Sequence, residues 1–257
     1  MYNFDEKKVT KELLVWLRNW FEENGKGCNA ILGISGGKDS TVAAALCVKA
    51  LGKDRVYGVM MPDGEQKDIS DSIRVCKILD IKNTTRNIKK AVDAEKEIAL
   101  EGVKDFGKEE LTNQTLINIP PRIRMATLYA IGQSMNGRVI NTCNLSEEWV
   151  GYSTRWGDSV GDVAPLANLT VEEVRKVGLE LGLPYDLVYK TPSDGLCGKT
   201  DEDSLGFTYA ALDKYLRTGE CDPEVQALID RKHKINEFKL KEIPKFEYGK
   251  VLAKVRW

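Results

Sequence analysis

The sequence predicts an α/β fold in which helices cover both faces of a mostly parallel sheet, giving three layers. Between residues 30 and 144, short apolar runs alternate with segments rich in helix-forming residues, which is the pattern of repeated βα units. The first apolar run ends in a glycine-rich turn that opens a helix. Since the chain has 257 residues, 42% of them hydrophobic, and no low-complexity linker, we expect one domain over residues 1–257.

Each element of the first half follows from a local signal. Apolar residues in KELLVWLRNWFEE recur at helical spacing, which predicts an amphipathic helix over 9–23. The run AILGI at 30–34 is typical of a buried strand. Residues 41–51 are helix formers that end at Gly52, and glycine commonly follows the last residue of a helix. The same alternation predicts a strand at 55–61, a helix at 68–80, a strand at 83–88 and a helix at 89–101.

The second half has weaker signals, because polar residues and turn formers interrupt it at several places. Residues 147–169 show no sustained period. Thr170 and Glu173 have the spacing of a capping box, which marks the start of a helix. The elements expected here are a long loop at 103–121, a helix at 122–135, a strand at 138–144, a helix at 170–182, a long loop at 191–206 and two C-terminal helices.

The composition excludes several classes of protein. Lys and Arg (38) nearly balance Asp and Glu (39), so the chain has no overall positive charge to attract a nucleic acid, and only a local basic patch could do so. We expect no nucleic-acid partner. No apolar run is long enough to span a bilayer. The six cysteines form no C-x-x-C pair, which argues against a zinc site and favours reduced thiols in the cytoplasm. The only histidine, His233, lies in a charged segment where we expect a surface position, so a histidine-based triad is excluded.

The glycine-rich stretch GISGGKDST is the first candidate site. It differs from a Walker-type loop in two ways. Three residues rather than four separate the first glycine, Gly33, from the Gly-Lys pair, and an aspartate rather than Ser or Thr follows the lysine. A strand, a glycine turn and a helix start together direct backbone N–H groups at one point, where an oligophosphate can bind. An aspartate there would repel phosphate unless Mg²⁺ bridged the two. The predicted phosphate-binding residues are Gly33, Ile34, Ser35, Gly36, Gly37, Lys38, Asp39 and Ser40.

The string S-G-G-x-D-S resembles the signature of the ATP pyrophosphatases, which cleave ATP between the α and β phosphates and activate a carboxylate or carbonyl as its adenylate. The segments PPRIRM (120–125), NLSEEWVGYSTRWGDSVGD (144–162) and TPSDGLCGKTDEDSLGF (191–207) resemble the ammonia-dependent NAD synthetases of that group, in the same order. The resemblance implies a Rossmann-like fold of the adenine nucleotide alpha hydrolase type and a homodimer. It also implies ATP as co-substrate, Mg²⁺ as cofactor, and conversion of nicotinic acid adenine dinucleotide (deamido-NAD) and ammonia to NAD, AMP and pyrophosphate through an acyl-adenylate.

The resemblance also implies roles for particular residues. Asp39 and Glu147 would bind Mg²⁺, and Gln66, Thr142 and Ser193 would contact ATP. Arg122, Arg155 and Asp162 would bind the dinucleotide, and Asp158 would lie near the site where ammonia attacks. Apart from the resemblance, the glycine-flanked loop that carries Lys199 is expected to close over the reaction. From the residues alone, Glu147 is also an ordinary acidic residue at a helix start, and Gln66, Arg155 and Lys199 are ordinary surface residues. Cations that many relatives carry are replaced here by Met60 and Val171, and Phe238 replaces the histidine of a His-Lys pair.

Two other functions remain open at this point. One is a different ATP pyrophosphatase, such as another ligase or a tRNA-thiolating enzyme, which would require paired cysteines such as Cys143 and Cys197. The other is a non-catalytic adenine-nucleotide-binding module, which would need the loop but not Glu147 and Arg122. Too few residues precede Gly33 for a glutamine-hydrolysing domain, so we expect free ammonia as the nitrogen donor.

Overall fold

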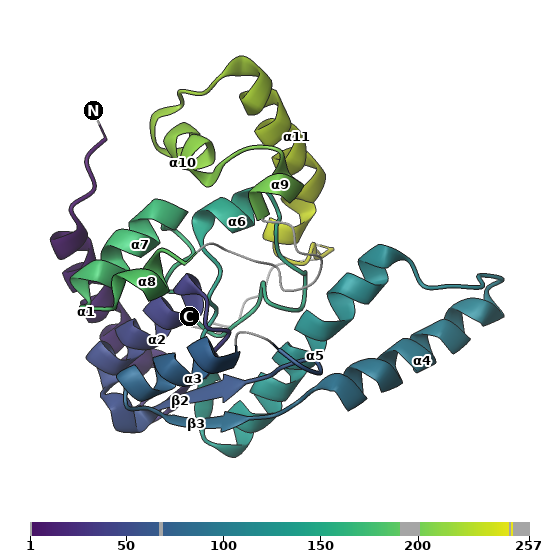
Figure 1. Cartoon of the computed structure of the whole chain (residues 1–257), viewed down its shortest axis with the longest axis horizontal. Helices are drawn as coiled ribbons and strands as arrows, with labels where there is room; N and C mark the ends of the chain where they lie inside the picture. Colours follow the sequence, from purple (N-terminus) through teal and green to yellow (C-terminus); the bar gives the residue numbers. More distant parts are fainter. Residues whose placement is uncertain (1, 67–68, 191–200, 247, 249–257) are drawn as a thin grey trace.

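The computed structural model describes residues 2–66, 69–190, 201–246 and 248. Its centre is a four-stranded sheet in which every neighbouring pair is parallel, in the order β3-β2-β1-β4 (Figure 1). The predicted parallel sheet is therefore confirmed. The strands are β1 (Asn29–Gly33), β2 (Val56–Met60), β3 (Lys82–Thr85) and β4 (Gly137–Val139).

The strand order creates a switch point between β1 and β4. The chain runs from β1 outward through β2 to β3, and β4 then returns to the other side of β1. At such a point the connections leave neighbouring strands toward opposite faces, which opens a crevice at the carboxyl ends of the strands where ligands bind. The glycine-rich loop follows β1, and the segment that contains Glu147 follows β4. The fold therefore brings these two segments together.

One face of the sheet carries most of the core. Alternate residues of β1, Ala30 and Leu32, are fully buried against the helices on this face because successive strand residues point to opposite faces. A short 3₁₀ turn, η1 (Lys53–Arg55), leads into β2. The helices of this layer are α1 (Glu6–Asn24), α2 (Lys38–Leu51), α3 (Ile69–Ile78), α7 (Val171–Glu180) and α8 (Tyr185–Val188).

The opposite face is covered by α4 (Lys89–Asp105) and α5 (Asn113–Ser134), with Ile31 of β1 buried against them. Residues 103–121, expected to be a loop, are mostly helical, so that prediction is wrong. Thr112 begins α5 by accepting a hydrogen bond from the Thr115 N–H at 3.2 Å. Pro120 lies inside the helix but is buried with its neighbour Ile119, so packing on the sheet outweighs the helix-breaking tendency of proline.

The third group of helices packs around its own apolar cluster, which includes Leu212 and Ile229. The two expected C-terminal helices are confirmed as α10 (Tyr209–Thr218) and α11 (Pro223–Leu240). Among the described residues, three short helices were not predicted. They are α6 (Leu145–Trp149), α8, and α9 (Asp201–Leu205), which lies inside the loop expected at 191–206.

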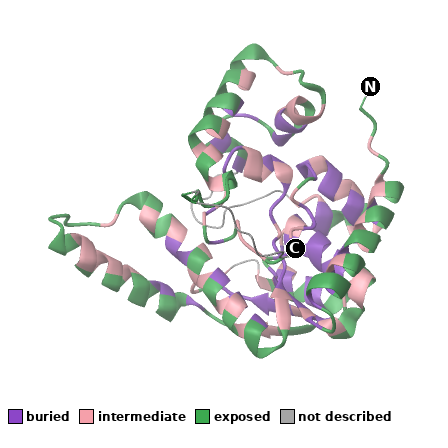
Figure 2. Ribbon diagram, turned by 180° about the vertical axis from the view of Figure 1, so that it is seen from behind, coloured by how far each residue is buried: buried purple, intermediate pink, exposed green. Residues whose placement is uncertain are grey.

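Burial follows these layers. Figure 2 shows buried residues along the sheet and α2, whereas α4 is mostly exposed. The expected strands at 83–88 and 138–144 are shorter than predicted, since β3 ends at Thr85 and β4 at Val139. Beyond β4, only Ile140 continues the pairing, through a parallel bridge to Val163. No helix among the described residues is both long enough and apolar enough to cross a membrane.

One face of α11 binds the end of α6 and the turn after it. His233 is half-buried, with its Nδ1 2.8 Å from the Trp149 carbonyl oxygen and its ring stacked on the Trp149 ring at 4.1 Å. The expectation that His233 lies on the surface is wrong, because the helix uses this face for packing. Asn236 donates to the Val150 carbonyl at 3.1 Å, and Lys239 donates to those of Gly151 and Ser153 at 2.9 and 3.1 Å.

Candidate active site

The glycine-rich loop turns tightly before α2. Gly36 has φ +81, and a Cβ there would lie 2.9 Å from the Ser72 backbone nitrogen, so only glycine fits. The Ser35 hydroxyl accepts from the Gly37 N–H at 3.2 Å and lies 3.0 Å from the Ser40 hydroxyl. These bonds shape the loop around the start of α2, where the first N–H groups of a helix have no partner within it. The loop therefore presents an anion-binding surface.

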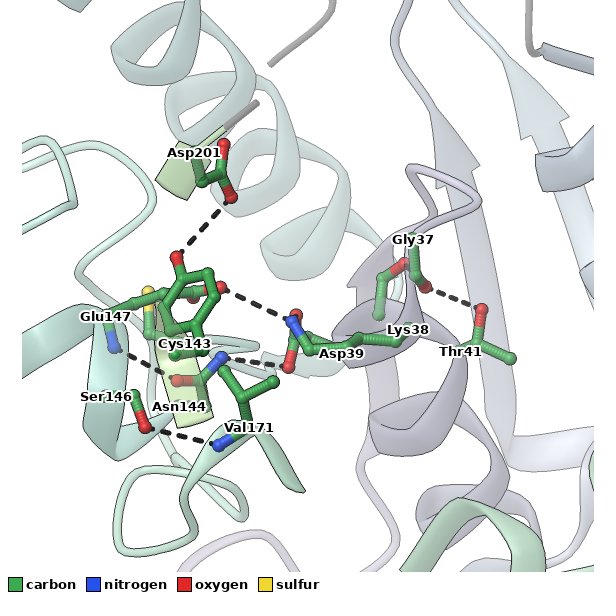
Figure 3. A network of polar contacts seen from close by, with 12 residues as sticks. Gly37, Lys38, Asp39, Thr41, Cys143, Asn144, Ser146, Glu147, Val171 and Asp201 are labelled. Carbon is green, nitrogen blue, oxygen red and sulfur yellow. Dashed lines mark hydrogen bonds and ion pairs between the residues drawn. The ribbon is translucent and has the colours of Figure 1, made fainter. Parts of the chain in front are cut away.

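Lys38 is the most buried charge of the loop, with its side chain only 4% exposed. Its Nζ lies 2.7 Å from Asp39 Oδ2 and 3.5 Å from Glu147 Oε1 (Figure 3). The same ammonium lies 5.9 Å from the centre of the Tyr209 ring. Burial alone would lower the pKa of Lys38, but attraction to Asp39 and Glu147 outweighs burial and raises it above the usual value. Lys38 is therefore a cation held between two carboxylates.

Asn144 joins the two carboxylate-bearing segments. Its side chain is fully buried and donates from Nδ2 to Asp39 Oδ1 at 3.0 Å. Its Oδ1 accepts from the Glu147 N–H at 3.0 Å, which makes Asn144 the N-cap of α6. Asn144 was not among the residues predicted for the site. The available signal was an asparagine that follows a strand and stands three residues before a glutamate, which is a common helix start.

Burial and the neighbouring Asp39 make a negative charge on Glu147 unfavourable unless a cation lies beside it. Burial and the nearby Asp39 raise the pKa of Glu147 to about 8, although Lys38 opposes the shift. The described residues contain no group of three or more acidic, histidine or cysteine side chains arranged for a metal. Two carboxylates are nevertheless hard oxygen ligands that suit Mg²⁺, and Mg²⁺ usually takes its other ligands from phosphate and water. The pair thus fits a metal ion that arrives with a nucleotide.

The segment after Thr154 lies beside the end of β4. Asp158 Oδ1 accepts from the Thr154 N–H at 2.8 Å, and the Asp158 carbonyl accepts from Asn141 Nδ2 at 3.0 Å and Cys143 Sγ at 3.2 Å. This places the predicted ammonia-site residue next to the strand end that leads to Asn144. Burial and the charge of Asp158 raise the pKa of the Cys143 thiol well above its usual value, so Cys143 is held as a thiol.

The three residues expected to bind the dinucleotide form a second group on the α5 side. Arg122 Nε donates to the Arg155 carbonyl at 3.3 Å. The Arg155 guanidinium lies over the rings of Trp156, at 4.9 Å, and Phe238, at 5.4 Å. Asp162 accepts from the Val139 N–H at 2.7 Å and from the hydroxyl of Tyr129, a residue of α5, at 3.4 Å. Arg122 and Asp162 are both exposed, and each lies on α5 or contacts it.

The remaining expected residues are less closely joined to the carboxylates. Thr142 and Gln66 are half-buried, after β4 and before α3 respectively. Met60 and Val171 are core residues, 2% and 0% exposed, so the apolar replacements at these positions serve packing. Ser193, Cys197 and Lys199 lie outside the residues that the structure describes.

Comparison with known proteins decides the family. The family model described as NAD synthase matches residues 9–249. The chain belongs to the NAD synthase family. Within this family, the NH(3)-dependent NAD(+) synthetase of Thermococcus sibiricus is 43% identical over 219 residues, which cover 84% of this chain and 82% of the relative. The Finegoldia magna protein of the same name is 37% identical to this chain. The aligned region covers 95% of this chain and 97% of the relative.

Solved structures of NAD synthase relatives agree with this assignment. The NMN synthetase from Francisella tularensis has a TM-score of 0.85 at 30% identity, over 96% of this chain and 100% of that one. The NH3-dependent NAD synthetase from Campylobacter jejuni has a TM-score of 0.75 at 28% identity, over 95% of this chain and 100% of that one. The family, the ligase class and the Rossmann-like fold predicted from the sequence are confirmed.

Proposed function

We propose that the chain, acting as one domain, amidates deamido-NAD with ammonia at the expense of ATP and forms NAD, AMP and pyrophosphate. One observation carries this proposal. Asp39, after β1, and Glu147, after β4, converge on a single cation position beside the glycine-rich loop. A pair of carboxylates next to an anion-binding loop suits Mg²⁺ bound to a nucleoside triphosphate.

The first step forms the acyl-adenylate. A carboxylate oxygen of deamido-NAD attacks the α-phosphorus of ATP, and the bond from that phosphorus to the bridging oxygen breaks, so that pyrophosphate leaves. The N–H groups at the start of α2 bind the departing phosphates, and Asp39 with Glu147 would hold Mg²⁺, which neutralises their charge. Arg122, Arg155 and Asp162 would hold the dinucleotide in line with ATP, which supplies much of the rate.

The second step forms the amide. The lone pair of ammonia attacks the activated carbonyl carbon, the bond to the adenylate oxygen breaks, and AMP leaves while nitrogen loses one proton. Asp158, whose Oδ1 accepts from the Thr154 N–H, would orient the ammonia. The other expected residues keep the roles given above. Contacts to ATP would come from Gln66, Thr142 and Ser193, and Lys199 would close over the reaction.

A direct assay tests this proposal. The pure protein is incubated with ATP, Mg²⁺, ammonium and deamido-NAD, and pyrophosphate and NAD are both measured. We expect the two products in equal amounts. Pyrophosphate without NAD would indicate another ATP pyrophosphatase, and the absence of both would indicate a nucleotide-binding module. A tRNA thiolase is disfavoured already, because the family model and the curated relatives that match this chain are NAD synthetases.

A second candidate acid is nicotinic acid mononucleotide. The likeness to an NMN synthetase, with a TM-score of 0.85, favours testing it, since amidation of the mononucleotide gives NMN by the same two steps. The assay is therefore run with each acid in parallel. A kcat/KM for deamido-NAD above that for the mononucleotide supports the dinucleotide as the natural substrate, and the reverse order makes NMN the product.

Ammonia is expected to be the nitrogen donor. At fixed total ammonium the rate should rise as the solution becomes mildly alkaline, because only unprotonated ammonia has a lone pair for attack. Glutamine should give no NAD above background, since the only histidine of the chain, His233, is bound to Trp149 and so pairs with no described cysteine. Glutamine-driven synthesis in ammonia-free solution by the isolated chain would disprove this expectation.

Arg122→Ala is expected to raise the KM for deamido-NAD about tenfold or more, as for a lost hydrogen bond to a charged group, with little change in the KM for ATP. The reason is that Arg122 is exposed on α5 and contacts Arg155, another residue proposed to bind the dinucleotide. Steady-state kinetics with each substrate varied in turn shows whether only the KM for deamido-NAD rises. Arg231→Ala, at another exposed arginine, is the control. Equal increases in both KM values would remove Arg122 from this role.

We further propose a cytoplasmic homodimer. The described cysteines are free thiols, as in a reducing compartment. Leu116 and Ile117 at the start of α5 are 37% and 49% exposed, so a partner subunit could cover them beside the dinucleotide group. Sedimentation of a fully active monomer would contradict the dimer.

A further inference from the structure

Lys38 occupies the point where the two carboxylates converge. Its ammonium contacts Asp39 at 2.7 Å and Glu147 at 3.5 Å, and the two carboxylate side chains are each only 18% exposed. We propose that Lys38 is an internal counterion that holds the metal position until Mg²⁺ arrives with ATP, so that this residue sets the affinity for free divalent cations. The inference rests on the proposed metal role of Asp39 and Glu147.

Asn144 limits the movement of the Asp39 carboxylate and of the Glu147 backbone when no cation is present. Asn144 binds the Asp39 carboxylate through Nδ2 and the Glu147 backbone through Oδ1, so it holds both segments at one spacing. Two like charges close together in a mostly buried site repel each other strongly. A permanent cation removes this repulsion. Lys38 is suited to the task because it adjoins Asp39 in the chain and is itself buried.

This arrangement has a consequence for the order of binding. Free Mg²⁺ would have to displace the Lys38 ammonium, which would then lie buried without a partner. ATP removes that penalty, because its phosphate oxygens beside the loop offer the displaced ammonium a new counterion. Bound ATP therefore raises the affinity of this site for the metal, and by linkage the bound metal raises the affinity for ATP by the same factor. The metal should bind weakly alone and tightly with ATP.

Lys38→Met removes the ammonium and keeps a chain of similar length. With Mn²⁺ as the probe and no nucleotide, electron paramagnetic resonance measures the free ion. We expect the variant to bind Mn²⁺ at least about tenfold more tightly than the parent, because a competing charge at ion-pair distance is gone. Lys38→Arg should resemble the parent. Lys53→Met, in the exposed Lys53–Asp80 pair, is the matched control and should leave Mn²⁺ binding unchanged.

Thermal unfolding provides a second readout without substrate. In chelator, Lys38→Met should melt at a lower temperature than the parent, and Mg²⁺ alone should restore the variant while hardly changing the parent. The double variant Lys38→Met/Asp39→Asn loses one charge of each sign. It should be more stable in chelator than the single variant but should not bind Mn²⁺ more tightly than the parent. If the single variant does not fold, recovery of folding in the double variant provides the same test.

The outcomes separate this inference from the proposed function. If Lys38→Met binds Mn²⁺ no more tightly than the parent, or if the double variant is no more stable than the single one in chelator, Lys38 is not the internal counterion. Neither result would affect amide formation by the parent protein. Conversely, a parent that forms no amide would refute the proposed reaction while the Mn²⁺ comparison still reported on the cation position.

Discussion

Asp39→Asn is expected to lower the rate of pyrophosphate release by about 10³-fold, the upper end of the loss when one stabilising group for developing charge is removed. The Asp39 carboxylate contacts Lys38 through Oδ2 and Asn144 through Oδ1. A neutral amide is a much poorer ligand for Mg²⁺, so charge on the leaving pyrophosphate would be left uncompensated. Pyrophosphate release under limiting Mg²⁺ is the measurement, and Glu147→Gln should give a similar loss.

Asp80→Asn is the matched control for this experiment. Asp80 is an exposed carboxylate paired with Lys53 at the amino end of β3, on the side of the sheet away from the loop. Its φ of 51 is a conformation that asparagine adopts as readily as aspartate. We expect activity close to that of the parent. If Asp39→Asn released pyrophosphate at the parent rate, the two-carboxylate metal site would be wrong.

Asn144→Ala is expected to reduce both stability and activity. The variant loses the N-cap of α6 and leaves a mostly buried Asp39 oxygen without its donor, which together cost roughly 2–4 kcal/mol. For a chain of this size that corresponds to a fall in Tm of about 5–15 °C. Calorimetry measures the stability, and the KM for Mg-ATP reports whether the carboxylates still converge.

A second substitution separates the two functions of Asn144. Asn144→Asp keeps an N-cap acceptor for the Glu147 N–H but directs a carboxylate at Asp39. We expect a smaller loss of Tm than with alanine and a comparable loss of activity. Asn24→Ala removes an exposed asparagine whose side chain donates to the Trp20 carbonyl, and it serves as the control. An unchanged Tm and rate in Asn144→Ala would show that the bridge has no role.

Local signals explain which features the sequence could predict. The apolar run at 30–34, the glycine turn and the helix that follows are adjacent in the chain, so the position of the loop and of Asp39 at the start of α2 could be predicted. The contact of Lys38 with Glu147 and the bridge through Asn144 depend on β4 lying next to β1. Strand order is set by packing across the whole sheet, and no short stretch of sequence encodes it.

The missed elements have physical reasons of their own. α5 extends through Pro120 because Ile119 and Met125 bury against the sheet, and this stabilisation is invisible in local propensity. α6 and α9 span five residues each, too few to display a helical period. His233 was misplaced because a charged helix can still bury one face, and that face was fixed by Trp149, 84 residues earlier in the chain.

The contacts between α11 and the end of α6 have a consequence for folding during synthesis on the ribosome. His233, Asn236 and Lys239 bind carbonyls more than 80 residues earlier in the chain. A ribosome adds these side chains long after the strands and the glycine-rich loop have emerged. Until it does, the carbonyls at the end of α6 lack these partners, and the helix that carries Glu147 is not locked in place. A growing chain therefore completes the contacts around the end of α6 only after α11 has been synthesised.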